Sequence, residues 1–293
     1  MTKINWTYCQ KNSDSILSAG LNILRKDSLK NFSTEFPKNY GNYLISDKSK
    51  KWNYTGEAKN LFSRLKQHSK EKTSTFYKNY KKFENEFADY PKGLGINNFE
   101  IRTIFTLIGR KELEEFTIVN VPAVLNKFQK GKRNIFKQKV GAEIWNETQN
   151  NFQLILEQGE KKLMSLKSYP WFQAEIPEAA GLYWVENISK GLIYIGESSN
   201  IYERYNTHSG KTYFSALRRH IGENILGFKL QTINKRKRYF SDTEDKKITS
   251  FLTKCTIKSY PISFGRYELE EYLIKKYNPL LNRKGNKKDA YNG

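Results

Sequence analysis

The chain has 293 residues, 38% of them hydrophobic and 14% aromatic, which is the composition of a globular protein and excludes wholesale disorder. Lys and Arg number 51 against 30 Asp and Glu, a formal net charge of +21, and this surplus favours a polyanion such as nucleic acid as partner. No apolar run reaches the ~18 residues of a membrane span, and the first residues lack the pattern of a signal peptide, so we expect no membrane association and a cytoplasmic location.

Two further features bound the architecture. The length favours two domains, because one domain usually takes ~100 to 200 residues. The cysteines Cys9 and Cys255 lie far apart without a partner motif, so neither a disulfide framework nor a zinc site is expected.

The first predicted element is a helix containing Ile16, Leu17 and Gly20. A similar set, Ile155-Leu156 and Gly159, precedes the second half of the chain. The sequence therefore indicates an internal repeat whose unit begins with a helix.

A hairpin is predicted next, because the apolar and aromatic residues 43–45 and 52–54 are separated by a polar segment. Residues 182–185 and 192–195 predict the same hairpin in the second half. Each predicted strand carries one tyrosine, and the two sets are 140 positions apart: Tyr43 with Tyr54, and Tyr183 with Tyr194.

A helix follows each hairpin and carries an arginine and a histidine four residues apart. The pairs are Arg64 with His68 and Arg204 with His208. Residues at this spacing lie one turn apart on the same face, and the apolar pattern puts them at the edge of the buried side. A solvated face is the alternative interpretation.

A later helix contains three acidic residues in each copy. At about 100° per residue, only Glu270 of the trio Glu268, Glu270 and Glu271 falls inside the apolar arc. Glu114 occupies the equivalent place in the first copy. A carboxylate among apolar neighbours is costly without a partner, and a metal ion is one such partner. Helix capping or an ion pair is the alternative.

The segment between the copies predicts one helix, because Val140, Ile144, Phe152 and Leu156 recur at multiples of four. We place the boundary near residue 136, which gives domains of residues 1–136 and 137–293. The offset between the copies rises from 140 to 156 ahead of the acidic helix, so the second copy carries an insertion of 16 residues. We place this insertion at a stretch of four basic residues, Lys235, Arg236, Lys237 and Arg238. The stretch is either an arm that contacts DNA phosphates or a solvated loop.

The joint spacing resembles the GIY-YIG nuclease family, named after two short strands. Here these read Gly181-Leu182-Tyr183 with Tyr194-Ile195-Gly196, and Gly41-Asn42-Tyr43 with Tyr54-Thr55-Gly56. The departures at Leu182, Asn42 and Thr55 remove no catalytic group. The resemblance spans nearly the whole chain and implies an α/β (α+β) fold. It consists of two tandem domains, each a small, mainly antiparallel three-stranded sheet flanked by helices, joined by a helical linker.

The resemblance implies the same six roles in each copy. The glutamates bind the metal and the arginines hold the scissile phosphate. The first tyrosine positions or deprotonates the water, the second supports the phosphate and the proton network, the histidines act in proton transfer or phosphate contact, and the asparagines brace the site. Whether tyrosine or histidine is the base stays open. The candidates are Tyr43, Tyr54, Arg64, His68, Glu114, Asn126, Tyr183, Tyr194, Arg204, His208, Glu270 and Asn282.

The implied activity is hydrolysis of phosphodiester bonds in double-stranded DNA with Mg²⁺, which Mn²⁺ can replace. Two complete site sets predict a monomer that acts as a pseudo-dimer and cuts both strands, with restriction or anti-phage defence as its setting. The alternatives are a structure-specific DNA repair nuclease and a catalytically silent nucleic-acid-binding protein that retains the fold. In an intermediate case one copy cuts and the other only grips DNA, which predicts nicking.

Overall fold

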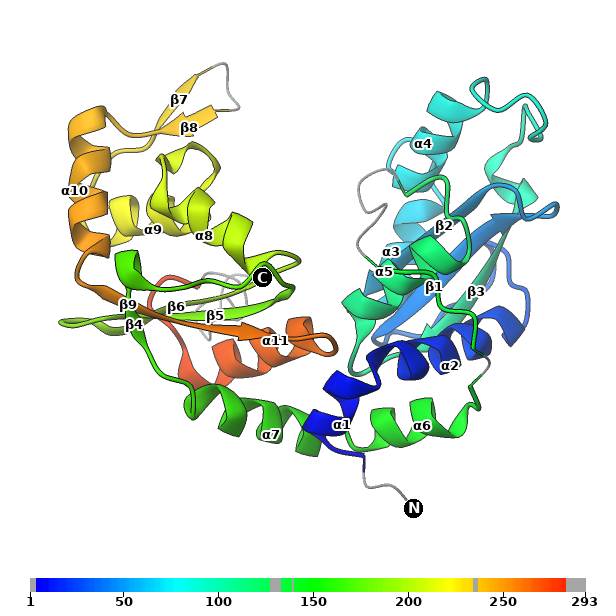
Figure 1. The fold of residues 1–293 in the computed structure, drawn as a ribbon. Coiled ribbons are helices and arrows are strands. Elements are labelled where there is room, and N and C mark those ends of the chain that lie inside the picture. The colour runs from blue at the N-terminus through cyan, green and yellow to red at the C-terminus, as the bar shows by residue number, and fades with distance from the viewer. Residues whose placement is uncertain (1–3, 127–132, 139, 234–236, 283–293) are drawn as a thin grey trace. The chain divides into compact units, whose positions relative to one another are not determined.

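The computed structural model describes residues 4–126, 133–138, 140–233 and 237–282. The chain divides into two compact units, Met1–Ile155 and Leu156–Gly293 (Figure 1). Each unit is a mixed α/β fold around an antiparallel sheet, so the predicted fold class and tandem arrangement are confirmed. The boundary near residue 136 stays a prediction.

The first unit contains a sheet of strand order β2-β1-β3 within its described residues, and both pairings are antiparallel. Tyr43 and Ile45 of β1 belong to a core with α3 and α4, whereas the Asn42 amide donates to Arg110 O of α5. Since side chains alternate between the faces of a strand, α3 and α4 cover one face and α5 covers the other. The elements are α1 (Trp6–Lys11), α2 (Ser13–Lys26), β1 (Gly41–Asp47), β2 (Asn53–Ala58), α3 (Leu61–His68), α4 (Thr75–Phe83), η1 (Ile96–Asn98), β3 (Phe99–Phe105) and α5 (Arg110–Asn120).

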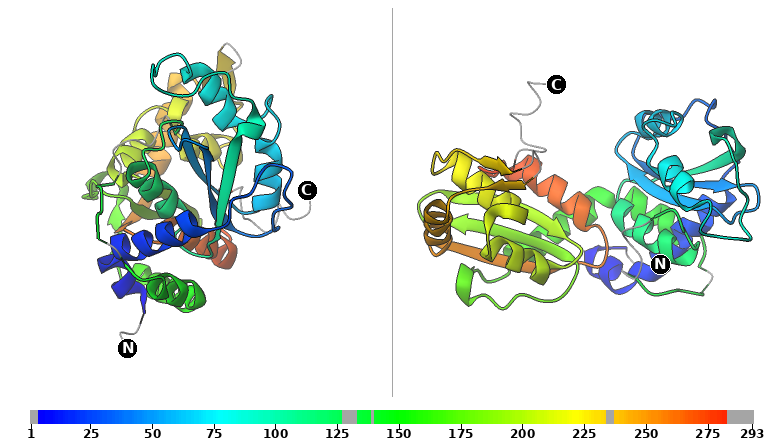
Figure 2. Two further views of the ribbon diagram at one scale, coloured as in Figure 1. Left: turned by 90° about the vertical axis from the view of Figure 1, so that its right-hand side faces the viewer. Right: turned by 90° about the horizontal axis from the view of Figure 1, so that it is seen from above.

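The second unit repeats this plan with additions. Tyr183 and Val185 pack with α8 and α9, and the Trp184 ring lies 5.0 Å from that of Tyr277 on α11, so helices again cover both faces (Figure 1, Figure 2). Helix α7 (Phe152–Met164) spans the division between the units. The elements that follow are β4 (Tyr169–Pro170), η2 (Trp171–Gln173), β5 (Gly181–Asn187), β6 (Gly191–Ser198), α8 (Ile201–Ser209), η3 (Thr212–Phe214), α9 (Ala216–Asn224), β7 (Gln231–Ile233), β8 (Lys237–Tyr239), α10 (Asp242–Leu252), β9 (Cys255–Pro261) and α11 (Arg266–Tyr277).

The second sheet has a strand that the sequence did not predict. Its order in the described part of the chain is β4-β9-β5-β6, so it has four strands where three were expected. The added strand β4 is short, with Tyr169 opposite Ile257 and Pro170 opposite Thr256. A proline has no N–H to donate, and it is tolerated here because β4 is an edge strand.

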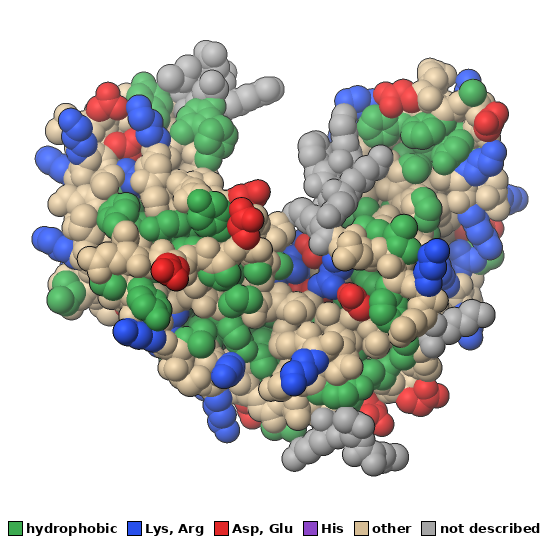
Figure 3. Space-filling model, in the orientation of Figure 1, with side chains coloured by type: hydrophobic (Ala, Val, Ile, Leu, Met, Phe, Trp, Pro, Cys, Tyr) green, Lys and Arg blue, Asp and Glu red, His purple; other side chains and the backbone are tan. Residues whose placement is uncertain are grey.

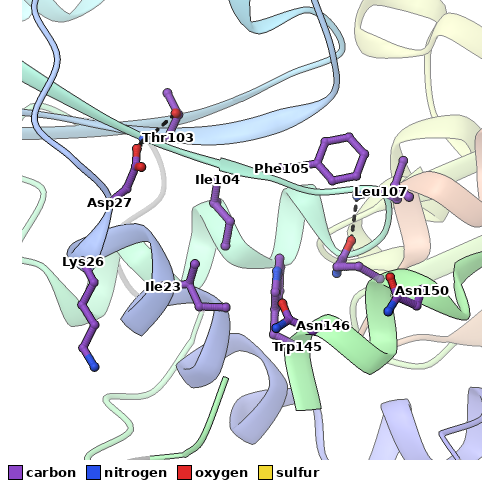
Figure 4. A pocket seen from close by; sticks show the side chains of 11 residues that line it. Ile23, Lys26, Asp27, Thr103, Ile104, Phe105, Leu107, Trp145, Asn146 and Asn150 are labelled. Carbon is purple, nitrogen blue, oxygen red and sulfur yellow. Dashed lines mark hydrogen bonds between the residues drawn. The ribbon is translucent and has the colours of Figure 1, made fainter. Parts of the chain in front are cut away.

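The single helix predicted between the copies is wrong. Two helices, α6 (Glu143–Asn150) and α7, meet at Asn151, whose side-chain amide donates to Glu147 O at 2.8 Å and caps α6. The apolar residues Ile144, Phe152 and Leu156 keep a spacing in multiples of four across this break, so the sequence pattern did not indicate it. The Gln149 side chain attaches α6 to the first unit, accepting from Leu107 N at 2.7 Å and donating to Ile108 O at 3.0 Å. A pocket of about 730 Å³ between α2, β3 and α6 contains none of the candidate site residues (Figure 4).

The second unit has elements that the first unit lacks. Between α9 and β9 the chain forms the hairpin β7-β8 and helix α10, where the first unit has residues 84–98 between α4 and β3. Arg218 on α9 is 1% exposed and pairs with Asp245 on α10, with 3.0 Å between Nη2 and Oδ1. This buried ion pair fixes the insertion to the core of the unit.

The distribution of basic side chains and the state of the two cysteines can be compared with the sequence analysis. Lys and Arg side chains are spread over the visible face of both units (Figure 3). Cys9 and Cys255 are free and buried. Within the described ranges no helix is both long and apolar enough to span a membrane.

Candidate active sites

Each site is built on the hairpin because a glycine lies opposite its first tyrosine. Tyr43 pairs with Gly56 across β1 and β2, and Tyr183 pairs with Gly196 across β5 and β6. A Cβ atom on Gly56 would lie 2.2 Å from Tyr43 Oη, and one on Gly196 would lie 2.3 Å from Tyr183 Oη. Only glycine therefore lets the phenol lie across the neighbouring strand.

The tyrosine hydroxyl reaches the buried histidine on the helix that follows. Tyr43 Oη lies 2.9 Å from His68 Nε2, and Tyr183 Oη lies 3.0 Å from His208 Nε2. Both histidines are buried, with His208 1% exposed, whereas the sequence put them at the edge of the buried side. A contact between the first tyrosine and the histidine is therefore present in both units.

A serine completes each chain of hydrogen bonds, and the sequence did not indicate it. His68 Nδ1 lies 3.4 Å from Ser74 Oγ, and His208 Nδ1 lies 2.7 Å from Ser215 Oγ. Both serines are N-caps, of α4 and α9, and their Oγ atoms accept a backbone N–H of that helix. The spacing from histidine is six residues in one copy and seven in the other, so the alignment of the repeats did not pair the serines.

The arginine adds a cation beside the phenol. In the first unit Arg64 Nε donates to Tyr43 Oη at 3.2 Å. Since a guanidinium only donates, Tyr43 Oη accepts there, and its own hydrogen is available to His68 Nε2. Arg64 and Arg204 are half-buried, so each retains exposed surface that a phosphate can reach.

Burial keeps these groups neutral. It raises the pKa of Tyr43 and of Tyr183 well above the usual range, and the second tyrosine of each hairpin raises it further. Burial, followed by the charge of Arg64, lowers the pKa of His68 to about 3. Burial and the neighbouring arginines lower the pKa of His208 to about 3 as well. An uncharged imidazole can accept a hydrogen bond from the uncharged phenol.

The second tyrosine lies beside the same pair. The ring centroids of Tyr54 and Tyr43 are 6.4 Å apart, and those of Tyr194 and Tyr183 are 6.0 Å apart. Burial and the charge of Glu270 raise the pKa of Tyr194. In each unit the two tyrosine rings and the histidine ring therefore form one aromatic cluster.

The open edge of the hairpin holds the asparagine and glutamate. In the second unit the Asn282 side chain accepts from Ile195 N at 2.9 Å and donates to Ile195 O at 2.7 Å. Two residues further along this strand, Glu197 N donates to Glu270 Oε1 at 3.1 Å. The Asn126 side chain makes the same two bonds to Thr55 in the first unit, at 2.9 and 2.7 Å.

The first glutamate has a different partner. Glu114 Oε2 accepts from Lys111 Nζ at 2.7 Å, one turn earlier on α5. Burial raises the pKa of Glu114, and Lys111 opposes this shift. Helix α11 has Tyr267 at the position of Lys111, so the alignment of the repeats did not indicate this ion pair.

The expectation that only the middle acid faces the core is wrong. Glu268 is 4% exposed and Glu112 is 0% exposed, so both are more buried than Glu270 or Glu114. These two acids lie in the first turn of their helices, where unpaired backbone N–H groups stabilise a negative charge. The helical projection treated the apolar arc alone and did not include this end effect.

The basic stretch is only partly described. Lys235 and Arg236 lie outside the described residues, whereas Lys237 and Arg238 belong to β8, where Arg238 is exposed. Burial and the charge of Arg238 lower the pKa of Arg219 on α9, which places these two arginines near each other. The charge of Arg219 also contributes to the lowered pKa of His208 and opposes the raised pKa of Tyr194.

The donor set fits Mg²⁺ bound through one carboxylate. Among the residues described, no group of three or more His, Cys, Asp or Glu is arranged to hold a metal ion. Mg²⁺ usually keeps several waters and is bound by one or two carboxylates together with substrate phosphates. Glu270, held in place by a backbone N–H beside the phenol and arginine, suits such a role.

Comparison with known proteins agrees with this geometry. A family model described as GIY-YIG catalytic domain matches residues 171–292, and a second model of the same description matches residues 39–107. No curated protein and no solved structure matches the chain. The two matched segments contain both hairpins and both Arg–His helices. The chain belongs to the GIY-YIG nuclease superfamily and carries two GIY-YIG catalytic domains in tandem.

Proposed function

We propose that the protein is a metal-dependent DNA endonuclease of the cytoplasm that serves in restriction or anti-phage defence. The observation that supports this most directly is the double occurrence of the bond between a tyrosine hydroxyl and a buried histidine, at 2.9 and 3.0 Å. A net charge of +21 supports nucleic acid as the substrate. Two sites in one chain can act on one duplex as a pseudo-dimer, and two equivalent sites would cut both strands.

The scissile phosphate is assigned to the arginines. Arg64 and Arg204 are half-buried next to the phenols, and a planar guanidinium matches the geometry of a phosphate. Tyr54 and Tyr194 support the phosphate from the second strand of each hairpin. Mg²⁺ bound at Glu114 or Glu270 would neutralise charge on the phosphate and lower the pKa of a water molecule, and Mn²⁺ would substitute.

The proton path runs through the tyrosine to the histidine. Because His208 is 1% exposed and its Nε2 lies 3.0 Å from Tyr183 Oη, we assign it proton transfer rather than phosphate contact. Tyr183 Oη takes a proton from the attacking water and passes its own proton to His208 Nε2. Ser215 holds the far side of the imidazole ring, and Asn282 braces the neighbouring strand β6. Tyr43, His68 and their neighbours have the same arrangement.

The hairpin β7-β8 is assigned to backbone contacts with DNA. The four basic residues sit next to each other in an insertion found only in the second copy, and phosphate contacts position a protein without reading sequence. Neutralising two of these charges should weaken DNA binding and reduce its salt dependence. The residues are Lys235, Arg236, Lys237 and Arg238.

Cleavage of plasmid and phage DNA by the wild type and by Glu270→Gln and Glu114→Gln tests the proposal. Supercoiled DNA should be cut with Mg²⁺ and should stay intact with a chelator or in the double variant. If the wild-type protein binds DNA but cuts none of the substrates with either ion, the endonuclease assignment fails in favour of a silent binding protein.

A further inference from the structure

The first unit contains a further pocket, of about 430 Å³, that is lined in part by Leu44 and Ser46 of β1. The alternate residues of this strand, Tyr43 and Ile45, belong to the core with α3 and α4. Side chains alternate between the two faces of a strand. The pocket therefore lies on the face of the sheet away from the bond between Tyr43 and His68, and it is separate from the candidate active site.

Four basic side chains line this pocket, and no acidic residue is among the described residues that line it. Arg25 comes from the last turn of α2, Lys50 and Lys51 from the connection between β1 and β2, and Arg102 from β3. Glu100 precedes Arg102 by two positions on β3 but does not line the pocket. Cations gathered without an acid create a positive potential, which attracts an anion.

Arg102 is the basic residue that most needs a partner. It is half-buried, and its Nε is buried with no hydrogen-bond acceptor in the described part of the chain. Arg25, in contrast, donates from Nη2 to Asn120 O at 2.7 Å. A buried donor without an acceptor costs free energy, and the cost is larger for a charged group. An anion in the pocket would offset this cost.

The pocket has room and apolar surface for more than an inorganic anion. Its volume is in the range of ~300 to 1,000 Å³ that small-molecule sites occupy. Tyr90, Val121 and Pro122 line it together with the cations, and Lys51 Nζ lies 5.6 Å from the centroid of the Tyr90 ring. Guanidinium groups match phosphate oxygens, and nucleobases stack on aromatic rings. A phosphate joined to a sugar and a base has both kinds of group.

We propose that this pocket binds a nucleotide through its phosphate group. Arg102 holds the phosphate, the exposed Lys50 adds a second positive charge, and Tyr90 packs against the sugar or base. A free nucleotide and a nucleotide within a DNA strand present the same phosphate chemistry, and the two probes below distinguish them. The site does not depend on the proposed nuclease activity, because no candidate catalytic residue lines it.

Calorimetric titration of the full chain with deoxyadenosine monophosphate, in the presence of a chelator, tests the free nucleotide as ligand. The wild type should bind it, and Arg102→Gln should bind it at least about tenfold more weakly because a charged hydrogen bond is lost. Lys48→Gln is the matched control, since Lys48 is exposed in the same turn but does not line the pocket. It should bind as the wild type does, and deoxyadenosine, which has no phosphate, should bind to neither protein.

Fluorescence anisotropy with a labelled DNA duplex, again with chelator, tests the nucleotide within a strand. Here Arg102→Gln should bind at least about tenfold more weakly than Lys48→Gln, although both variants lose one charge. Lys50→Asn is the second pocket variant, because asparagine tolerates the φ of +57° at this position. Circular dichroism checks folding, and Lys50→Asn decides the result if Arg102→Gln does not fold. Affinities for both probes that are the same in the pocket variants as in Lys48→Gln would overturn the site and leave the endonuclease proposal intact.

Discussion

Tyr183 Oη and His208 Nε2 lie 3.0 Å apart, and both side chains are buried, at 3% and 1% exposure. The phenol is thus within hydrogen-bonding distance of the imidazole. The same relation holds for Tyr43 and His68 at 2.9 Å. This contact makes the first prediction specific to the hydroxyl.

Replacing Tyr183 with phenylalanine should lower the cleavage rate by about 10² or more, because the proton path loses its first acceptor. The affinity for Mn²⁺ should stay unchanged, since Glu270 is untouched. Initial rates on supercoiled plasmid measure the effect, with Tyr43→Phe as the matched variant. A Tyr183→Phe protein that cuts at the wild-type rate would remove the phenol from the proposed path.

The histidines predict a pH dependence of stability. An unfolded imidazole has a pKa of ~6.5, whereas the pKa of His208 in the folded protein is about 3. The unfolded state binds the proton between these values, so the free energy of unfolding falls as the pH drops below the unfolded value. Above it, the histidine contributes no pH dependence.

Urea unfolding at pH 7.5 and pH 5 checks this expectation. Between pH 7.5 and pH 5 the free energy of unfolding should fall more in the wild type than in His208→Gln, whose side-chain amide does not titrate. His68→Gln gives the parallel comparison in the first unit. Equal losses in the wild type and both variants would show that the imidazoles are protonated without cost in the folded state.

Ser215→Ala should affect both folding and cleavage. The hydroxyl caps α9 and contacts His208, so its loss should cost about 1 kcal/mol of stability and leave the imidazole less firmly oriented. Ser215→Thr retains a hydroxyl and should recover most of both losses. Ser74→Ala in the first unit should cost similar stability. A Ser215→Ala protein with wild-type cleavage would limit the serine to helix capping.

Gly196→Ala tests the close approach of the two strands. The added Cβ would lie 2.3 Å from Tyr183 Oη, and such overpacking typically costs about 1 to 3 kcal/mol. The ring must move away from His208, so cleavage should fall with stability. The control is Gly191→Ala in the same hairpin, where φ is +68° and no atom lies within 4 Å of the added Cβ. It should strain the turn but leave the cleavage rate unchanged.

The repeated residues of the site could be predicted because each is a fixed number of positions from a strand or helix. Tyr183 on β5 and Arg204 on α8 are separated in the chain only by β6, so their spacing in the sequence predicts that they lie in the same site. Ser215 and Arg219 follow after η3, where the two copies differ in length, and the repeat contains no signal for them. Lys111 was overlooked for the opposite reason, since a comparison that seeks identity discards a position with Lys in one copy and Tyr in the other.

The errors in the fold have a common cause, which is that local patterns do not register breaks or distant pairing. Asn151 ends α6 by its backbone conformation, while the apolar spacing continues into α7. Strand β4 exists only because β9 presents a free edge to Tyr169 and Pro170, a neighbour about ninety residues away in the sequence. Neither feature changes the side-chain periodicity from which the elements were predicted.

The bonds from Asn282 and Glu270 to strand β6 also protect the sheet. This strand is at the margin of its sheet, and outward-facing N–H groups there could recruit a strand from another molecule. The Asn282 amide covers both polar backbone atoms of Ile195, and the Glu270 carboxylate covers Glu197 N. The residues that build the site therefore also prevent a strand of a neighbouring molecule from pairing with the edge of the sheet. Truncating Glu270 to alanine would uncover an aggregation-prone margin, whereas glutamine preserves the acceptor and keeps an inactive protein monodisperse.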